Sequence, residues 1–81
     1  MSEFTHVLVA GRGYWGRGAT IGEAIVNAQW LRLGDKTFWY PCTERTRIDS
    51  YGRFYDGKVG EPTHGTIGRK SKGLPTFKAN K

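Results

Sequence analysis

The residues of this chain with catalytic potential are few and far apart. His6, His64 and Cys42 are its two histidines and its single cysteine. No Ser-His-Asp or Cys-His order has a supporting sequence context, and no pair of carboxylates stands out as a general acid and base. A lone thiol forms no disulfide within the chain and holds no metal cluster. We therefore expect a protein that is not an enzyme and that carries neither metal nor cofactor.

A run of glycine, arginine and aromatic residues at positions 11–20 has the composition of a binding loop. It reads Gly-Arg-Gly-Tyr-Trp-Gly-Arg-Gly-Ala-Thr. Arginine makes forked contacts with phosphate, and exposed aromatic rings stack on unpaired bases. The run predicts a nucleic-acid-binding loop with these contact residues: Arg12, Tyr14, Trp15 and Arg17. The alternative is that both rings pack in the core, because a small domain needs large aromatics for burial.

The glycines of this run also match the G-x-G-x-x-G spacing of dinucleotide-binding loops, at Gly11, Gly13 and Gly16. Such a loop works inside a parallel βαβ unit of a large sheet, and the chain is too short for one. Tyr14 and Trp15 fill the x-x positions, where their bulk would hinder a pyrophosphate. The spacing therefore does not predict a nucleotide cofactor.

The end of the sequence is strongly basic. The net charge is +6, and residues 62–81 hold five basic and no acidic residues. A basic segment attracts polyanions through counterion release, although it can also serve only as a solubilising end. Because Gly, Pro, Thr, Ser and Lys dominate, we expect residues 61–81 to form an irregular tail, partly ordered or mobile. Its predicted nucleic-acid contacts are Arg69, Lys70 and Lys72.

The elements beside the loop must position it. Residues 4–10 predict a strand, and their poor alternation suggests two covered faces or a central place in the sheet. Thr20 and Glu23 form a capping box that begins a helix running to about residue 33. Its apolar face consists of Ile21, Ala24, Ile25, Ala28 and Leu31. The free amides at the start of this helix would provide an anion site beside the loop.

Val26 and Trp30 form a second, smaller apolar stripe on the predicted helix. Either a loop or the tail folds over them, or they are exposed as a contact for another protein, since tryptophan is a common interface anchor.

Three further strands are predicted over residues 36–42, 45–50 and 53–59. Asp49 to Gly52 can close a hairpin between the last two, and Asp56-Gly57 is a competing turn signal that leaves the register open. Pro41 should end the first of these strands or place it at an edge. Alternation puts Phe38 and Tyr40 on one face, which leaves aromatic rings on an outer sheet surface. The order β-α-β-β-β predicts an α+β domain over residues 1–60, with one helix on a small antiparallel sheet of three to four strands.

The preferred hypothesis is a small non-enzymatic module that binds single- or double-stranded nucleic acid through the loop and the tail. The chain also resembles, in size, charge and aromatic content, the small accessory proteins that phages encode against host or defence machinery, including anti-CRISPR proteins. That resemblance is one of style and implies an inhibitor of a bacterial protein or nucleoprotein complex. In such an inhibitor, the apolar stripe of Val26 and Trp30 and the outer sheet aromatics would be the contacts. No signal peptide or membrane span is evident, so a cytoplasmic location is expected.

Overall fold

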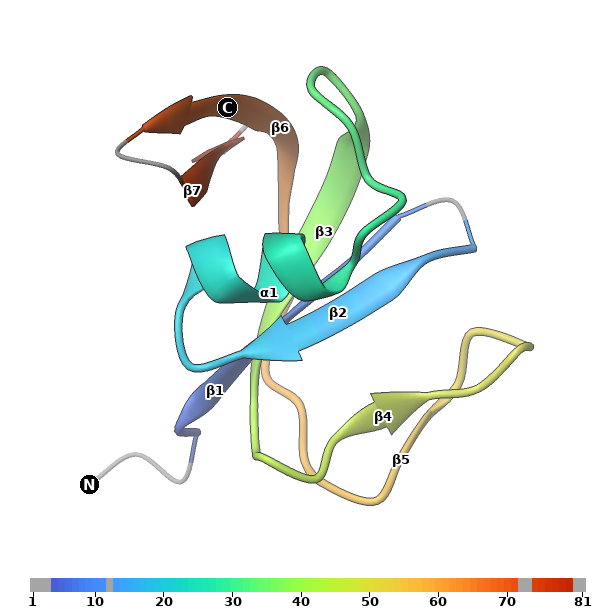
Figure 1. Cartoon of the computed structure of the whole chain (residues 1–81). Coiled ribbons are helices and arrows are strands. Elements are labelled where there is room, and N and C mark those ends of the chain that lie inside the picture. Colours follow the sequence, from blue (N-terminus) through green and yellow to red (C-terminus); the bar gives the residue numbers. More distant parts are fainter. Residues whose placement is uncertain (1–3, 12, 72–73, 80–81) are drawn as a thin grey trace.

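The computed structural model describes residues 4–11, 13–71 and 74–79, with the backbone alone at 69–71 and 74. The elements are β1 (His6–Ala10), β2 (Trp15–Gly18), α1 (Ile21–Asn27), β3 (Lys36–Cys42), β4 (Arg47–Ile48), β5 (Phe54–Tyr55), β6 (Thr63–Ser71) and β7 (Leu74–Ala79). Five strands form an antiparallel sheet in the order β2-β1-β3-β6-β7, and β4 pairs with β5 (Figure 1). The α+β class is confirmed, with a larger sheet than predicted.

Both faces of β1 are buried, as its unbroken apolar pattern suggested. Val9 faces α1 and packs with Ala24, Ile25 and Ile67. Leu8 faces the opposite way, in a second core with Ala10 and Cys42. The sheet therefore has a hydrophobic core on each side, one under α1 and one under the β4–β5 hairpin.

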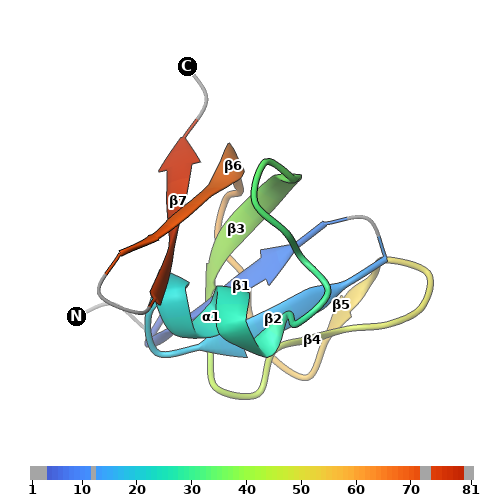
Figure 2. The ribbon, with the colours of Figure 1, turned by 45° about the horizontal axis from the view of Figure 1, so that its top comes forward.

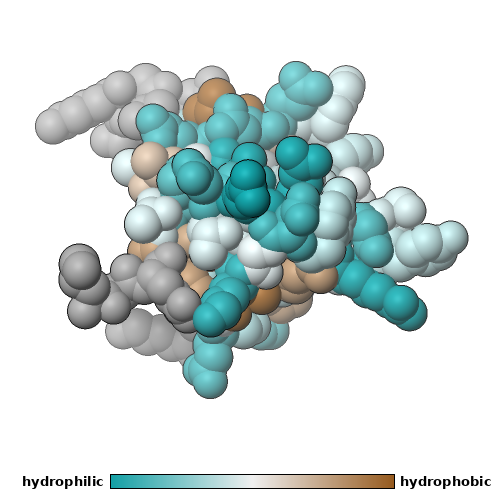
Figure 3. Space-filling model, turned by 90° about the horizontal axis from the view of Figure 1, so that it is seen from below, coloured by the Kyte–Doolittle hydropathy of each residue, from teal (hydrophilic) through white to brown (hydrophobic). Residues whose placement is uncertain are grey.

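The β4–β5 hairpin forms the second cover. Its turn closes as predicted, since the Gly52 amide donates to the Asp49 carbonyl at 3.0 Å and Gly52 has a φ of 79°. The two strands are shorter than expected. Ile48 and Phe54 pack inward, whereas the outer side carries charged residues such as Arg47 and Arg53. Figure 3, which looks at the molecule from below Figure 1, shows a mostly hydrophilic surface there.

The prediction of a helix to residue 33 is wrong, although its start is confirmed. The Glu23 amide donates to Thr20 Oγ1 at 3.2 Å, and Glu23 Oε2 accepts from the Ala19 amide at 3.0 Å. The helix stops after Asn27 because Ala28 leaves the helical conformation, with φ −89° and ψ 60°. The chain turns there and brings Leu31 back against the core beneath α1.

The glycine run forms a β-hairpin rather than a strand-to-helix loop, and β2 was not predicted. The Gly11 amide donates to the Tyr14 carbonyl at 2.8 Å, and Gly13 has a φ of 76°, which favours glycine. On β2, a Cβ at Gly16 would overlap the Ala24 carbonyl oxygen and the Ala28 amide nitrogen. The glycine spacing thus serves a tight turn and a close approach of α1 to β2.

The prediction of an irregular tail over residues 61–81 is wrong, because β6 and β7 complete the sheet. Ile67, 3% exposed, belongs to the core under α1, and Phe77 packs against it. The Phe77 ring occupies the space that a Cβ at Gly65 would fill. Ile67 and Phe77 thus join this hairpin to the core, although most of its sequence is polar.

The strand at Lys36–Cys42 is confirmed, but Pro41 neither ends it nor places it at an edge. β6 pairs only with residues 36–39, so the missing amide hydrogen of Pro41 lies beyond the paired part of β6. The Pro41 carbonyl instead accepts from the Gly60 amide at 2.7 Å. A central strand therefore tolerates this proline.

Candidate nucleic-acid interface

Two residues predicted for different roles meet in the structure. Tyr14, expected to contact nucleic acid, and Trp30, expected to contact protein, have ring centroids 6.2 Å apart and an interplanar angle of 37°. Tyr14 is 46% exposed and Trp30 57% exposed. The premature end of α1 creates this pair, because it returns the chain toward the β1–β2 turn. We call it the Tyr14–Trp30 pair.

Basic side chains stand beside this pair. A hollow of about 440 Å³ is lined by Tyr14, Trp30, Arg32, Gly34, Asp35 and Lys36. The Asp35 carboxylate accepts a hydrogen bond from the Arg32 amide at 2.9 Å and closes the local turn. The Arg32 and Lys36 side chains are exposed. Neither residue was predicted as a contact, although two basic residues on either side of Gly34, soon after Trp30, were a usable signal.

The other two described loop candidates lie on β2 and face away from the pair. Trp15 is half-buried against the core formed by Leu8, Ala10 and Cys42. Arg17 is also half-buried, and its Nη1 donates to the Thr46 carbonyl at 2.6 Å. Both side chains therefore connect the sheet to the β4–β5 side of the molecule. Arg12 lies outside the described residues.

The start of α1 does not provide the expected anion site. The Glu23 carboxylate already accepts from the Ala19 amide, so a negative group occupies the position that a phosphate would take. The helix is only 7 residues long, which leaves a small dipole.

The backbone that carries two of the basic residues expected in the tail is separated from the loop. Arg69 and Lys70 belong to β6, near its end, and Lys72 lies outside the described residues. Figures 1 and 2 both place the end of β6 and the start of β2 on opposite sides of the molecule. The backbone of the end of β6 therefore lies apart from that of the start of β2.

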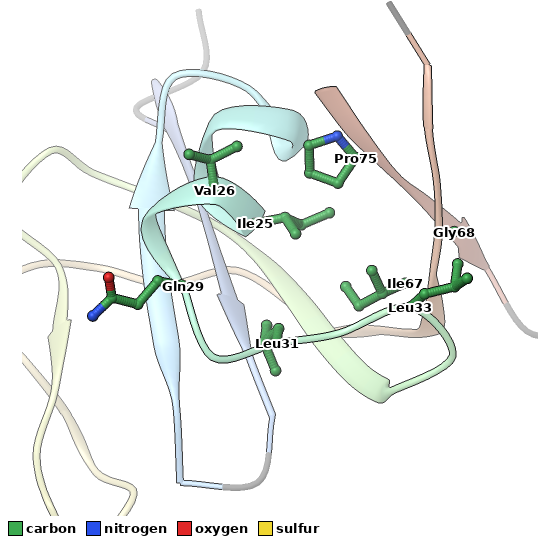
Figure 4. Close-up of a pocket in the computed structure, with 8 residues that line it drawn as sticks. All are labelled: Ile25, Val26, Gln29, Leu31, Leu33, Ile67, Gly68 and Pro75. Atoms are coloured by element: carbon green, nitrogen blue, oxygen red, sulfur yellow. The ribbon is translucent and has the colours of Figure 1, made fainter. Parts of the chain in front are cut away.

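Val26 and Trp30 line different hollows. Val26 is 51% exposed and borders an apolar groove of about 380 Å³ between α1 and the β6–β7 hairpin. The groove is lined by Ile25, Val26, Gln29, Leu31, Leu33, Ile67, Gly68 and Pro75 (Figure 4). The single stripe predicted for Val26 and Trp30 is wrong, since it needed a helix that continues past residue 30.

Cys42 belongs to the core beneath the β4–β5 hairpin. It is fully buried, and burial raises the pKa of its thiol, while a hydrogen bond with Thr46 and the charge of Arg17 lower it. Among the residues that the structure describes, no three of His, Cys, Asp and Glu gather as potential metal ligands. Nor does this part of the chain contain a helix long and apolar enough to cross a membrane.

Comparisons with known proteins found no match. No family model matches the chain, and neither a curated protein nor a solved structure matches it.

Proposed function

We propose that this protein is a small non-enzymatic module that binds single-stranded nucleic acid, with the Tyr14–Trp30 pair as its main contact. The observation that carries the proposal is two exposed, adjoining aromatic rings beside the exposed basic side chains of Arg32 and Lys36. Bases stack on aromatic faces, and cations hold the phosphates that follow them.

Single strands fit this surface better than a duplex. Stacking on a protein ring requires a base that is not already stacked between its neighbours, and each such contact is worth about 1–3 kcal/mol. The rings lie 6.2 Å apart at 37°, so they form a bent platform rather than two parallel plates.

The proposal is tested by titrating an unstructured oligonucleotide at several salt concentrations. Wild-type protein should bind at low salt, and log K should fall linearly with log[salt]. Tyr14→Ala or Trp30→Ala should weaken binding by about ten-fold, which corresponds to about 1.4 kcal/mol.

Tyr55→Ala is the matched control, because Tyr55 is also a tyrosine with 46% exposure but lies on β5. It should leave the affinity unchanged. Equal losses in all three variants, or no binding by the wild type at low salt, would refute the proposal.

The apolar groove beside Val26 favours a second candidate function, binding of a bacterial protein in the manner of a phage-encoded inhibitor. Leu33 is 66% exposed at the groove, a large apolar side chain in contact with solvent. Val26→Asp should then abolish capture of a partner from bacterial lysate, with and without nuclease. Loss of capture after nuclease alone would instead support nucleic-acid binding.

A further inference from the structure

The face of the sheet opposite α1 is only partly covered. The β4–β5 hairpin packs over Leu8, Ala10 and Cys42. Beyond it, Phe38 is 38% exposed, and His64, its direct neighbour on β6, is exposed as well. This part, which we call the outer face, comprises Lys36, Phe38, His64, Thr66 and Lys78.

The exposed rings of the outer face pack against other aromatic rings that lead to the core. Phe38 and His64 pack edge to face with centroids 4.4 Å apart. Phe38 also lies 6.4 Å from Tyr40, which packs edge to face on Phe54 at 4.7 Å. The row of rings thus runs from the core beneath the hairpin to the surface, and its buried end fixes the orientation of its exposed end.

Positive charge borders these rings. Lys36 is opposite Thr66, and Thr66 is opposite Lys78, so the three residues form a row across β3, β6 and β7. Directly opposite residues of antiparallel strands point to the same face. Lys36 and Lys78 are both exposed, so the row places two cations beside the Phe38–His64 rings.

Lys36 connects the outer face to the Tyr14–Trp30 pair. It lines the hollow beside that pair, and it is two residues from Phe38 on the same strand, about 7 Å along it. A bound strand that leaves Trp30 and follows Lys36 therefore reaches the Phe38 ring without crossing an uncharged gap.

We propose that the outer face is a second stacking platform, so that one single strand of several nucleotides binds to the Tyr14–Trp30 pair and the Phe38–His64 rings together. This inference rests on the proposed function and extends it from one contact to a continuous path. Aromatic rings on an exposed sheet, bordered by lysines, are the arrangement that stacks successive bases with little sequence preference.

The test compares thymidine oligonucleotides of about three and about ten nucleotides, which are shorter and longer than the path from one platform to the other. The Phe38→Ala/His64→Ala double variant should weaken binding of the longer one about ten-fold and leave the shorter one unchanged. Tyr14→Ala should weaken both. Lys78→Gln should reduce the salt slope for the longer one by about 0.7, whereas Arg45→Gln, an exposed charge on the hairpin side, should not.

An NMR titration gives a readout that does not depend on the stability of a variant. The chain has two histidines, so His6 serves as an internal control. The longer oligonucleotide should shift the ring signals of His64, and those of His6 should stay in place.

The outcomes separate this inference from the proposed function. If Tyr14→Ala weakens both lengths while the outer-face variants and the His64 signals are unaffected, the second platform is refuted and the proposed function stands. If the wild type binds neither length at low salt, both fail. If only the outer-face variants lose affinity, the outer face binds alone and the Tyr14–Trp30 pair is removed from the function. Equal affinity for a duplex of matched charge would overturn both, because the proposed function and the second platform each need unpaired bases.

Discussion

At Gly16 the backbone of α1 comes so close to β2 that no side chain fits between them. The Ala24 carbonyl and the Ala28 amide occupy the position of the missing Cβ. Glu23 Cβ and Ala24 N likewise approach the Cβ position of Gly18 to 2.6 and 2.8 Å. These contacts explain why positions 16 and 18 of the glycine-rich run at residues 11–20 are glycine.

Gly16→Ala should therefore lower the free energy of unfolding by about 2 kcal/mol or more, because backbone atoms cannot move aside as a flexible side chain can. Urea denaturation measures the loss. Gly13→Asn is the control, since Gly13 has no neighbour within 4 Å of its Cβ position and asparagine tolerates a positive φ. Similar stability of the two variants would contradict the close helix approach.

Cys42 should make stability sensitive to alkaline pH. Burial raises the pKa of its thiol, against the opposing effects of Thr46 and Arg17. Because the folded pKa is the higher one, the stabilising contribution is complete below the unfolded pKa of about 8.5. It is lost as the pH rises through the folded pKa. The free energy of unfolding should fall with pH in this range.

The measurement is a series of denaturation curves from about pH 7 to pH 9.5. Cys42→Ala should show a shallower decline than the wild type. If the free energy of unfolding fell equally with pH in the wild type and in Cys42→Ala, the thiol would have the same pKa in the folded and the unfolded state. Burial also raises the pKa of Tyr40, so its contribution adds to the decline at still higher pH, in both proteins.

Among the elements, the β6–β7 hairpin departs most from the sequence-based expectation. Its polar and glycine-rich composition indicated an irregular tail, yet Ile67 belongs to the core under α1 and Phe77 packs against it. The Ile67 amide donates to the Asp35 carbonyl, and its carbonyl accepts from the Gly34 amide. Backbone pairing of this kind leaves no trace in composition.

Removal of residues 61–81 should abolish cooperative unfolding, because the core under α1 would lose Ile67 and the sheet would lose two strands. Circular dichroism during heating measures the transition. Lys78→Gln, on the outer side of the same hairpin, should keep it. A shortened chain that unfolds cooperatively at the wild-type temperature would show that the hairpin is dispensable.

The predictable elements were those with strong local signals. Thr20 and Glu23 fixed the start of the helix, and the aromatic run fixed β3. The end of the helix was not predictable, because Ala28 and Leu31 continue the apolar period although the chain has already turned. For the same reason the sequence could name Tyr14 and Trp30 but could not bring them together, since their contact depends on that turn.

In the molecule as a whole, charge acts on folding and on the proposed binding in opposite directions. A net charge of +6 repels itself in the compact state. Added salt screens this repulsion, so raising NaCl from about 20 to about 200 mM should increase the free energy of unfolding slightly, by up to about 1 kcal/mol. Over the same range the affinity for single-stranded nucleic acid should fall.

Both quantities can be measured in one set of buffers, by urea denaturation and by fluorescence titration. Opposite trends would show that salt weakens binding without weakening the fold. A parallel fall of stability and affinity would mean that the loss of binding reflects unfolding.

The position of β7 beside α1 bears on how the chain folds during synthesis. β7 contacts a helix that precedes it by about fifty residues, and β6 adds to the far side of β3. While residues 61–79 remain inside the ribosome, the emerging segment exposes Val9, Ala24 and Ile25 without their partner Ile67. Contacts of such long sequence separation also form slowly. We therefore expect folding to follow the emergence of the last two strands as a single late step.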